Sequence, residues 1–92
     1  MRCAYQILIA GRVQGVAFRY HMMKKAKEYN ITGFVRNLSD GRVEAILNGA
    51  DQDLQKLLNW CKVGPDLASV KQLDILKIEP ANYIEFSIVK DA

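Results

Sequence analysis

The stretch GRVQGVAFRYH, residues 11–21, combines residue types that suit the binding of an anion. Gly15 permits a close approach of the backbone or an unusual φ angle, and the three apolar residues after it bring no competing polar side chain. Arg19 follows them, and its planar guanidinium can hold two phosphate oxygens at once, which a lysine cannot do. The composition of this stretch therefore favours a loop that wraps around a phosphate.

The position of this stretch supports the same chemistry. It lies between a predicted strand, residues 3–10, and a predicted helix, residues 18–30. The first N–H groups of a helix have no partner inside the helix and carry the positive end of its dipole. A cation in the first turn is disfavoured by that dipole. An anion bound beside Arg19 would offset this repulsion. From the residues alone, a plain strand-to-helix connection with a surface arginine stays open as the alternative.

The next elements form a predicted hairpin over residues 31–48. ITGFVRNL reads as one strand and RVEAILNG as the other, with the turn chemistry of SDG between them. Gly41 is free to take a positive φ angle there. Strand alternation sends Val35 and Asn37 to one face, and Phe34 and Arg36 to the other.

A second helix and two further strands complete the chain. Apolar residues at i, i+3, i+4 and i+7 predict the helix, and VGPD at 63–66 ends it. Strands are predicted over residues 69–78 and 83–90. The apolar face of the helix consists of Leu54, Leu57, Leu58 and Cys61, and that of the last strand of Ile84, Phe86 and Ile88.

The order of elements predicts an α+β fold of the ferredoxin-like βαββαβ type with an additional C-terminal strand. Two helices can cover one face of a mainly antiparallel sheet in this arrangement. The crossover places the third strand between the first and the second. The loop at 11–19 and the end of the second strand can therefore face a common cleft.

Two segments together resemble the acylphosphatase family. GRVQGVAFR matches its pattern G-x-V-Q-G-V-x-F-R, and GFVRNLSDGRV matches G-[FWY]-V-x-N-x-x-D-G-x-V. The resemblance implies hydrolysis of carboxyl-phosphate mixed anhydrides to a carboxylate and inorganic phosphate, without a cofactor or metal. It implies that Arg19 binds the phosphoryl group and that Asn37 positions the attacking water. The phosphate-binding residues would be Gln14, Gly15, Val16, Ala17, Phe18 and Arg19.

Hydrolysis of an acyl phosphate needs only a small set of protein groups. An acyl phosphate expels a carboxylate, whose acid has a pKa of about 4, so no general acid is needed. Phosphoryl transfer requires mainly in-line positioning and neutralisation of the equatorial oxygens. Two positions depart from the family pattern without replacing a catalytic residue. Ala17 stands where bacterial members often have glycine, and Phe34 where tryptophan or tyrosine is common.

Other polar and aromatic residues have simpler interpretations. His21 points away from the direction of Arg19 on a helix, which favours a packing or solvent-facing role over catalysis. Arg36 is interpreted as a surface residue, and Asp40 as a turn residue. Trp60 is expected to pack partly buried in the second helix.

The composition and net charge of the chain limit the kinds of partner that it can bind. The 92 residues are 50% hydrophobic and 25% charged with a net charge of +3, which fits one globular domain, residues 1–92. The charge favours anionic partners but is too small to indicate nucleic acid.

No apolar stretch approaches the ~20 residues of a membrane span. Cys3 and Cys61 form no metal or redox motif. We expect a cytoplasmic monomer with reduced core thiols that acts on a small acyl phosphate, with phosphate as product and competitor.

Three other functions fit the sequence less well. An RNA-recognition domain has the same element order but needs aromatic residues on the third strand, which GRVEAILNG lacks. A metal carrier needs paired cysteines in the first loop, which are missing there. A non-catalytic acyl-phosphate binder would keep the loop, and the presence of both Arg19 and Asn37 argues against it.

Overall fold

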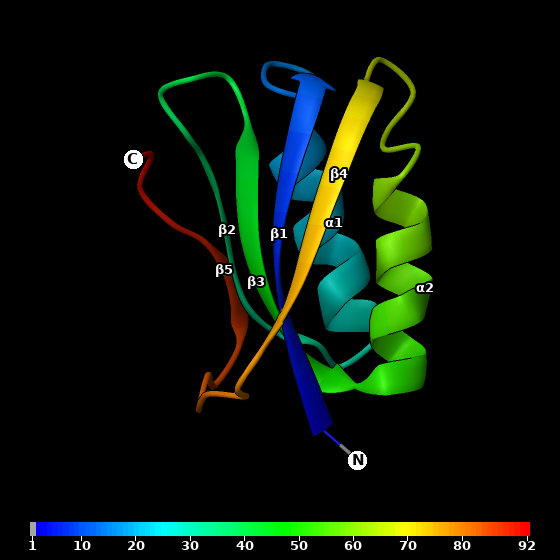
Figure 1. Ribbon diagram of the computed structural model, residues 1–92, viewed down its shortest axis with the longest axis vertical. Helices are drawn as coiled ribbons and strands as arrows, with labels where there is room; N and C mark the ends of the chain where they lie inside the picture. The colour runs from blue at the N-terminus through cyan, green and yellow to red at the C-terminus, as the bar shows by residue number, and fades with distance from the viewer. Residues whose placement is uncertain (1) are drawn as a thin grey trace.

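The computed structural model describes residues 2–92, which form one mixed β-sheet and two helices (Figure 1). The strand order in the sheet is β4-β1-β3-β2-β5. The predicted crossover is confirmed, because β3 lies between β1 and β2 and pairs antiparallel with both. The elements are β1 (Arg2–Arg12), α1 (Phe18–Glu28), β2 (Thr32–Asn37), β3 (Val43–Ala50), α2 (Asp51–Cys61), β4 (Ser69–Ile78) and β5 (Phe86–Ile88).

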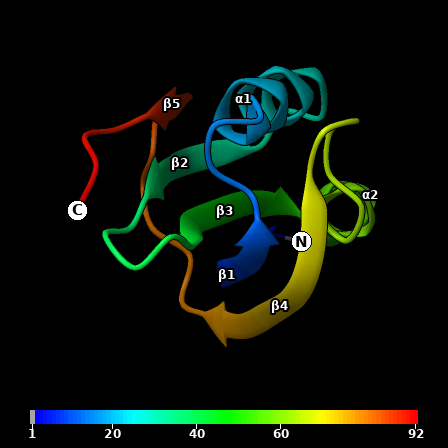
Figure 2. The ribbon, with the colours of Figure 1, turned by 90° about the horizontal axis from the view of Figure 1, so that it is seen from above.

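Both helices cover the same face of the sheet, as the ferredoxin-like fold requires (Figure 2). The apolar face predicted for α2 is confirmed, with all four of its residues buried. From α1, Phe18, Met22 and Ala26 enter the same core. The helix ends at Glu28 and not at the predicted residue 30. Asn30 follows with φ +56°, and the Ile31 N–H donates to the carbonyl of Ala26 at 2.8 Å. The core between sheet and helices is therefore built from the two apolar periodicities visible in the sequence.

The last strand is shorter than predicted. β5 spans only Phe86–Ile88 and pairs in parallel with β2, opposite Gly33 to Val35. Ile84 is 99% exposed, so the expectation that it shares a buried face with Phe86 is wrong. The physical reason is the topology. Residues 79–85 must carry the chain from β4 at one edge of the sheet to β5 at the other, and Ile84 belongs to that connection.

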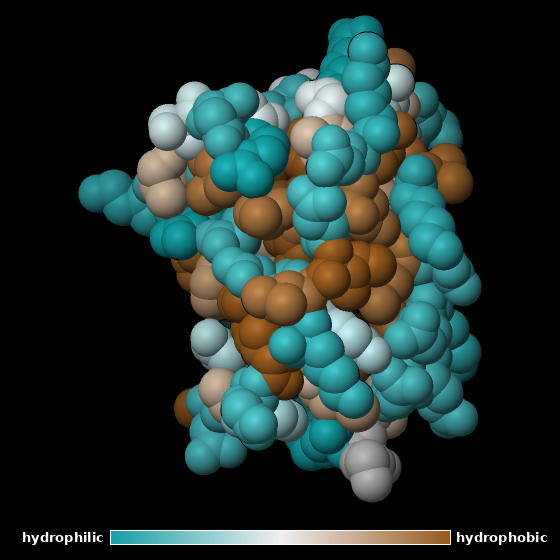
Figure 3. Space-filling view, in the orientation of Figure 1, coloured by the Kyte–Doolittle hydropathy of each residue, from teal (hydrophilic) through white to brown (hydrophobic). Residues whose placement is uncertain are grey.

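In residues 2–92, the other face of the sheet carries no helix (Figure 2). Apolar side chains gather over the middle of that face among hydrophilic ones (Figure 3). A polar cluster lies on the same face, where Glu44 accepts hydrogen bonds from Arg36 Nε at 2.7 Å and from Gln6 Nε2 at 2.8 Å. The alternation predicted for β2 is thereby confirmed, since Val35 and Asn37 are buried on the helix face.

The turn after α2 depends on Gly64. Its φ is +75°, and its N–H donates to the carbonyl of Trp60 at 2.8 Å. A Cβ atom placed there would lie 2.6 Å from Cε2 of Phe18 and 3.1 Å from Cβ of Ala68. The Phe18 ring is buried and packs edge-on against Trp60 with ring centroids 5.2 Å apart, so it cannot move aside freely.

We expect Gly64→Ala to lower the free energy of unfolding by about 2–4 kcal/mol, from the left-handed backbone and the core clash together. Gly41→Ala is the matched control, because Gly41 has φ +97° but nothing within 4 Å of a built Cβ. That control should lose only about 1 kcal/mol from the backbone alone. Urea unfolding of both variants measures the difference, and equal losses would show that the contact with Phe18 contributes nothing.

Both cysteines are buried free thiols in the core, as predicted. Burial raises the pKa of the Cys61 thiol to about 12. Because the thiolate is the reactive form, Cys61 in a Cys3→Ser variant should resist a disulfide reagent near pH 8 until the protein unfolds in urea. Labelling of the native variant at the rate of the unfolded chain would contradict this expectation.

Candidate active site

The connection from β1 to α1 leaves the N-terminus of the helix open. Ala17 is the N-cap residue, and no side chain within the described residues caps the helix there. The first N–H groups of a helix have no acceptor inside it. The backbone N–H of His21, one turn into the helix, donates to the carbonyl of Ala17 at 3.1 Å. The N–H groups before His21 therefore suit an anion that arrives from outside the chain.

Two residues of this loop adopt left-handed backbone angles. Gly15 has φ +74°, and a Cβ built there would meet nothing within 4 Å, so open space lies beside it. Ala17 has φ +63°, a conformation that costs an L-residue roughly 1–2 kcal/mol. A glycine at this position would adopt the same angle without that cost.

The side chain of Gln14 ties the loop to the β2–β3 hairpin. Its Nε2 donates to the carbonyl oxygens of Leu38 at 2.8 Å and of Arg42 at 2.9 Å. Leu38 directly follows Asn37, so this contact holds the loop beside the end of β2. The amide of Gln14 is thus occupied by the hairpin, which leaves only its backbone for an anion.

Asn37 is the last residue of β2 and is 9% exposed. Its Oδ1 atom is buried and has no hydrogen-bond partner within residues 2–92. Buried polar atoms are nearly always paired with protein or water. A water molecule that reaches this acceptor would satisfy it.

The C-terminal segment links Arg19 to Asn37. Nη1 of Arg19 donates to Oδ1 of Asp91 at 3.1 Å, and the N–H of the next residue, Ala92, donates to the carbonyl of Asn37 at 3.0 Å. Consecutive residues thus contact both predicted functional residues and bring them to one region of the surface. Sequence reasoning missed Asp91, because nothing in the periodicity of the tail shows where it lies.

The ion pair between Arg19 and Asp91 is accessible to solvent. Their side chains are 35% and 59% exposed, and such pairs contribute about 0–1 kcal/mol. A phosphate can therefore share or replace the Asp91 carboxylate at the guanidinium at small cost.

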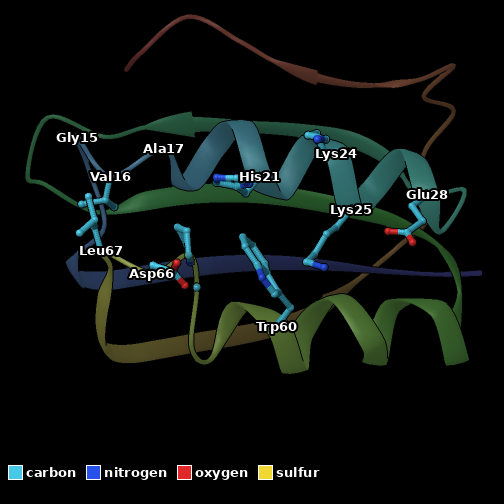
Figure 4. A pocket seen from close by; sticks show the side chains of 12 residues that line it. Gly15, Val16, Ala17, His21, Lys24, Lys25, Glu28, Trp60, Asp66 and Leu67 are labelled. Atoms are coloured by element: carbon cyan, nitrogen blue, oxygen red, sulfur yellow. The ribbon is translucent and has the colours of Figure 1, made fainter.

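The remaining candidates have structural contacts of their own. Asp40 accepts hydrogen bonds from the N–H and the Nε of Arg42 at 3.0 and 2.8 Å, as its predicted turn role requires. The hydrogen bond from the backbone of Arg42 is the main reason that the pKa of Asp40 is lowered. Trp60 is half-buried against Phe18, and His21 is exposed on the side of α1 that faces Trp60 (Figure 4).

Comparison with known proteins identifies the family. The profile of the acylphosphatase family matches residues 5–88. The chain belongs to the acylphosphatase family. The acylphosphatase of Methylococcus capsulatus is 44% identical over 86 residues, which cover 92% of this chain and 94% of that protein.

Solved structures of acylphosphatases share the fold. The protein from Coxiella burnetii has a TM-score of 0.92 at 34% identity, covering 96% of this chain and 93% of the other. The protein from Bacillus subtilis has the same score and identity over 98% and 100% of the two chains. The ferredoxin-like fold inferred from the order of elements is thereby confirmed.

A groove of about 960 Å³ lies beside the loop, between α1 on one side and the end of α2 with the turn after it on the other (Figure 4). Gly15, Val16 and Ala17 form one end of it, whereas Arg19 and Asn37 are not among its lining residues. The loop therefore separates two regions, one that holds Arg19 and Asn37 and one that runs between the helices.

Two absences hold for the described part of the chain. In residues 2–92, no set of three or more histidine, cysteine, aspartate or glutamate side chains is arranged to hold a metal ion. Over the same residues, neither helix is long and apolar enough to cross a membrane.

Proposed function

We propose that the protein hydrolyses the carboxyl-phosphate bond of acyl phosphates by in-line attack of a water on phosphorus. Backbone N–H groups of residues 14–19 and the guanidinium of Arg19 hold the phosphoryl oxygens. The amide of Asn37 orients the water. The buried and unpartnered Oδ1 of Asn37, beside the segment that contacts Arg19, is the observation that carries this assignment.

Each group supplies one element of the reaction. The open N-terminus of α1 and Arg19 neutralise charge that spreads over the equatorial oxygens in the transition state. Oδ1 of Asn37 accepts a hydrogen bond from the water and fixes its direction, although an amide is too weak a base to take a proton fully. The bond between phosphorus and the acyl oxygen breaks, and the carboxylate leaves without a proton because its acid is strong enough. The proton of the attacking water passes to an oxygen of the phosphoryl group, which leaves as inorganic phosphate.

Phosphate release from benzoyl phosphate tests the activity directly. We expect turnover that EDTA does not reduce, because the loop and Arg19 supply the positive charge, and competitive inhibition by inorganic phosphate. Binding of phosphate without turnover would instead indicate a non-catalytic acyl-phosphate binder.

The proposal also includes the cellular location and the oligomeric state of the protein. We place it in the cytoplasm as a monomer that acts as one domain. Its two buried thiols fit a reducing compartment. The exposed edge strand β4 carries Lys71, Asp74 and Lys77, and charges on an edge strand discourage pairing with another chain. Sedimentation of the purified protein tests the monomer.

A further inference from the structure

The side chain of Gln14 joins the two parts of the candidate site. The β1–α1 loop and the β2–β3 turn lie at the same end of the sheet (Figure 1). The amide nitrogen of Gln14, in the loop, donates to the carbonyl oxygens of Leu38 at 2.8 Å and of Arg42 at 2.9 Å. Both N–H groups of one nitrogen are thereby used, which fixes the side chain in a single orientation.

The two carbonyls that Gln14 contacts are also the ones that close the turn. The N–H of Leu38 donates to the carbonyl of Arg42 at 2.8 Å, and the N–H of Gly41 donates to the carbonyl of Leu38 at 3.2 Å. In the described chain, residues 38–42 form no other hydrogen bond with a residue outside the hairpin. The Gln14 amide is therefore the polar link that sets how far the turn lies from the loop.

Asn37 lies at the base of the same turn. It directly precedes Leu38, and its partner across the hairpin is Val43, which directly follows Arg42. A shift of the carbonyls of Leu38 and Arg42 would carry this pair of residues with it, and with them the amide of Asn37. Misplacing a reacting group by about 1 Å can lower a rate about 100-fold.

The loop itself is held by contacts that do not involve the Gln14 side chain. Val13, Val16 and Phe18 are buried in the core between the sheet and the helices. Arg19 belongs to α1 and pairs with Asp91. Loss of the Gln14 amide should therefore leave the phosphate-binding groups in place and move mainly the hairpin.

We propose that Gln14 is a positioning residue that sets the distance between the phosphate-binding loop and the amide of Asn37. The inference rests on the proposed function, in which the loop holds the phosphoryl group and Asn37 orients the attacking water. The side chain of Gln14 acts on that water through the hairpin and does not touch the reacting atoms.

Two substitutions remove the link in different ways. Gln14→Met keeps the length of the side chain but donates no hydrogen bond, and Gln14→Glu keeps the shape but only accepts when ionised. We expect either variant to lower kcat for benzoyl phosphate about 30-fold, while the affinity for inorganic phosphate changes less than about threefold. Both carbonyls keep their hydrogen bonds within the turn, so the variants should fold.

Gln6→Met is the matched control. Gln6 donates an amide hydrogen bond of the same 2.8 Å length to Glu44, on the face of the sheet opposite to Asn37. Its loss should leave kcat unchanged. Thermal unfolding of the three variants gives the folded fraction, so that kcat is counted per folded molecule.

A double variant distinguishes positioning from a general structural role. In Asn37→Ala no amide is left to misplace, so adding Gln14→Met should lower kcat by less than about a further threefold. An equal loss in both backgrounds would overturn the proposal. A fall in phosphate affinity as large as the fall in kcat would overturn it too.

The wild-type protein separates this inference from the proposed function. Failure to hydrolyse benzoyl phosphate would refute the proposed function. Hydrolysis with a normal kcat in both Gln14→Met and Gln14→Glu would refute the positioning role alone.

Discussion

Arg19→Ala should lower kcat/KM for an acyl phosphate by about 1,000-fold or more, or about 4 kcal/mol of transition-state stabilisation. The guanidinium is proposed to contact the phosphoryl group in both the ground state and the transition state. The affinity for inorganic phosphate should therefore fall together with kcat. Steady-state kinetics and phosphate titration measure the two effects.

Arg19→Lys should stay strongly damaging, because a point charge cannot reproduce the two parallel hydrogen bonds of the planar fork. The exposed pair with Asp91 contributes at most about 1 kcal/mol to folding, so neither variant should unfold. Lys27→Met controls for the loss of one charge on α1. Near-normal turnover of the lysine variant would contradict the bidentate role.

Asn37→Ala should reduce kcat about 100-fold or more, about 3 kcal/mol, while phosphate affinity changes little. The reason is that the amide is proposed to hold the water and not the phosphoryl group. Kinetics with benzoyl phosphate, read beside phosphate titration, separate these two effects.

The stability of Asn37→Ala distinguishes catalysis from packing. The buried Oδ1 has no partner in the described chain, and removing an unsatisfied buried acceptor costs folding little or even stabilises it. The hydrogen bond from Ala92 goes to the backbone carbonyl and survives the substitution. Turnover that persists while stability falls would withdraw Asn37 as the water-positioning residue and direct attention to His21 and Arg36.

The sequence predicts the core of the fold because each element carries its own periodicity. The i, i+3, i+4, i+7 spacing in α2 and the alternation of β2 decide which residues are buried, and Asn37 reaches the helix face by that alternation. The end of the chain shows no comparable signal. Ile84 alternates with Phe86 in sequence yet lies outside the sheet, because the topology requires those residues for a connection.

The candidate site could also be predicted only in part from the sequence. The type and order of residues in the loop indicate an anion site, but two contacts depend on tertiary structure. Gln14 bonds to carbonyls of the hairpin, and Asp91 pairs with Arg19 from the opposite end of the chain. The groove between the helices likewise exists only after α1 and α2 have packed on the sheet.

Hydrolysis in water enriched in oxygen-18 tests the central claim most directly. Attack of a water on phosphorus transfers its oxygen to the phosphate, whereas attack on the carbonyl carbon transfers it to the carboxylate. The account predicts label in the inorganic phosphate released from benzoyl phosphate and none in the benzoate. Label in the benzoate would contradict it, because the loop, Arg19 and Asn37 would then be arranged around the wrong atom.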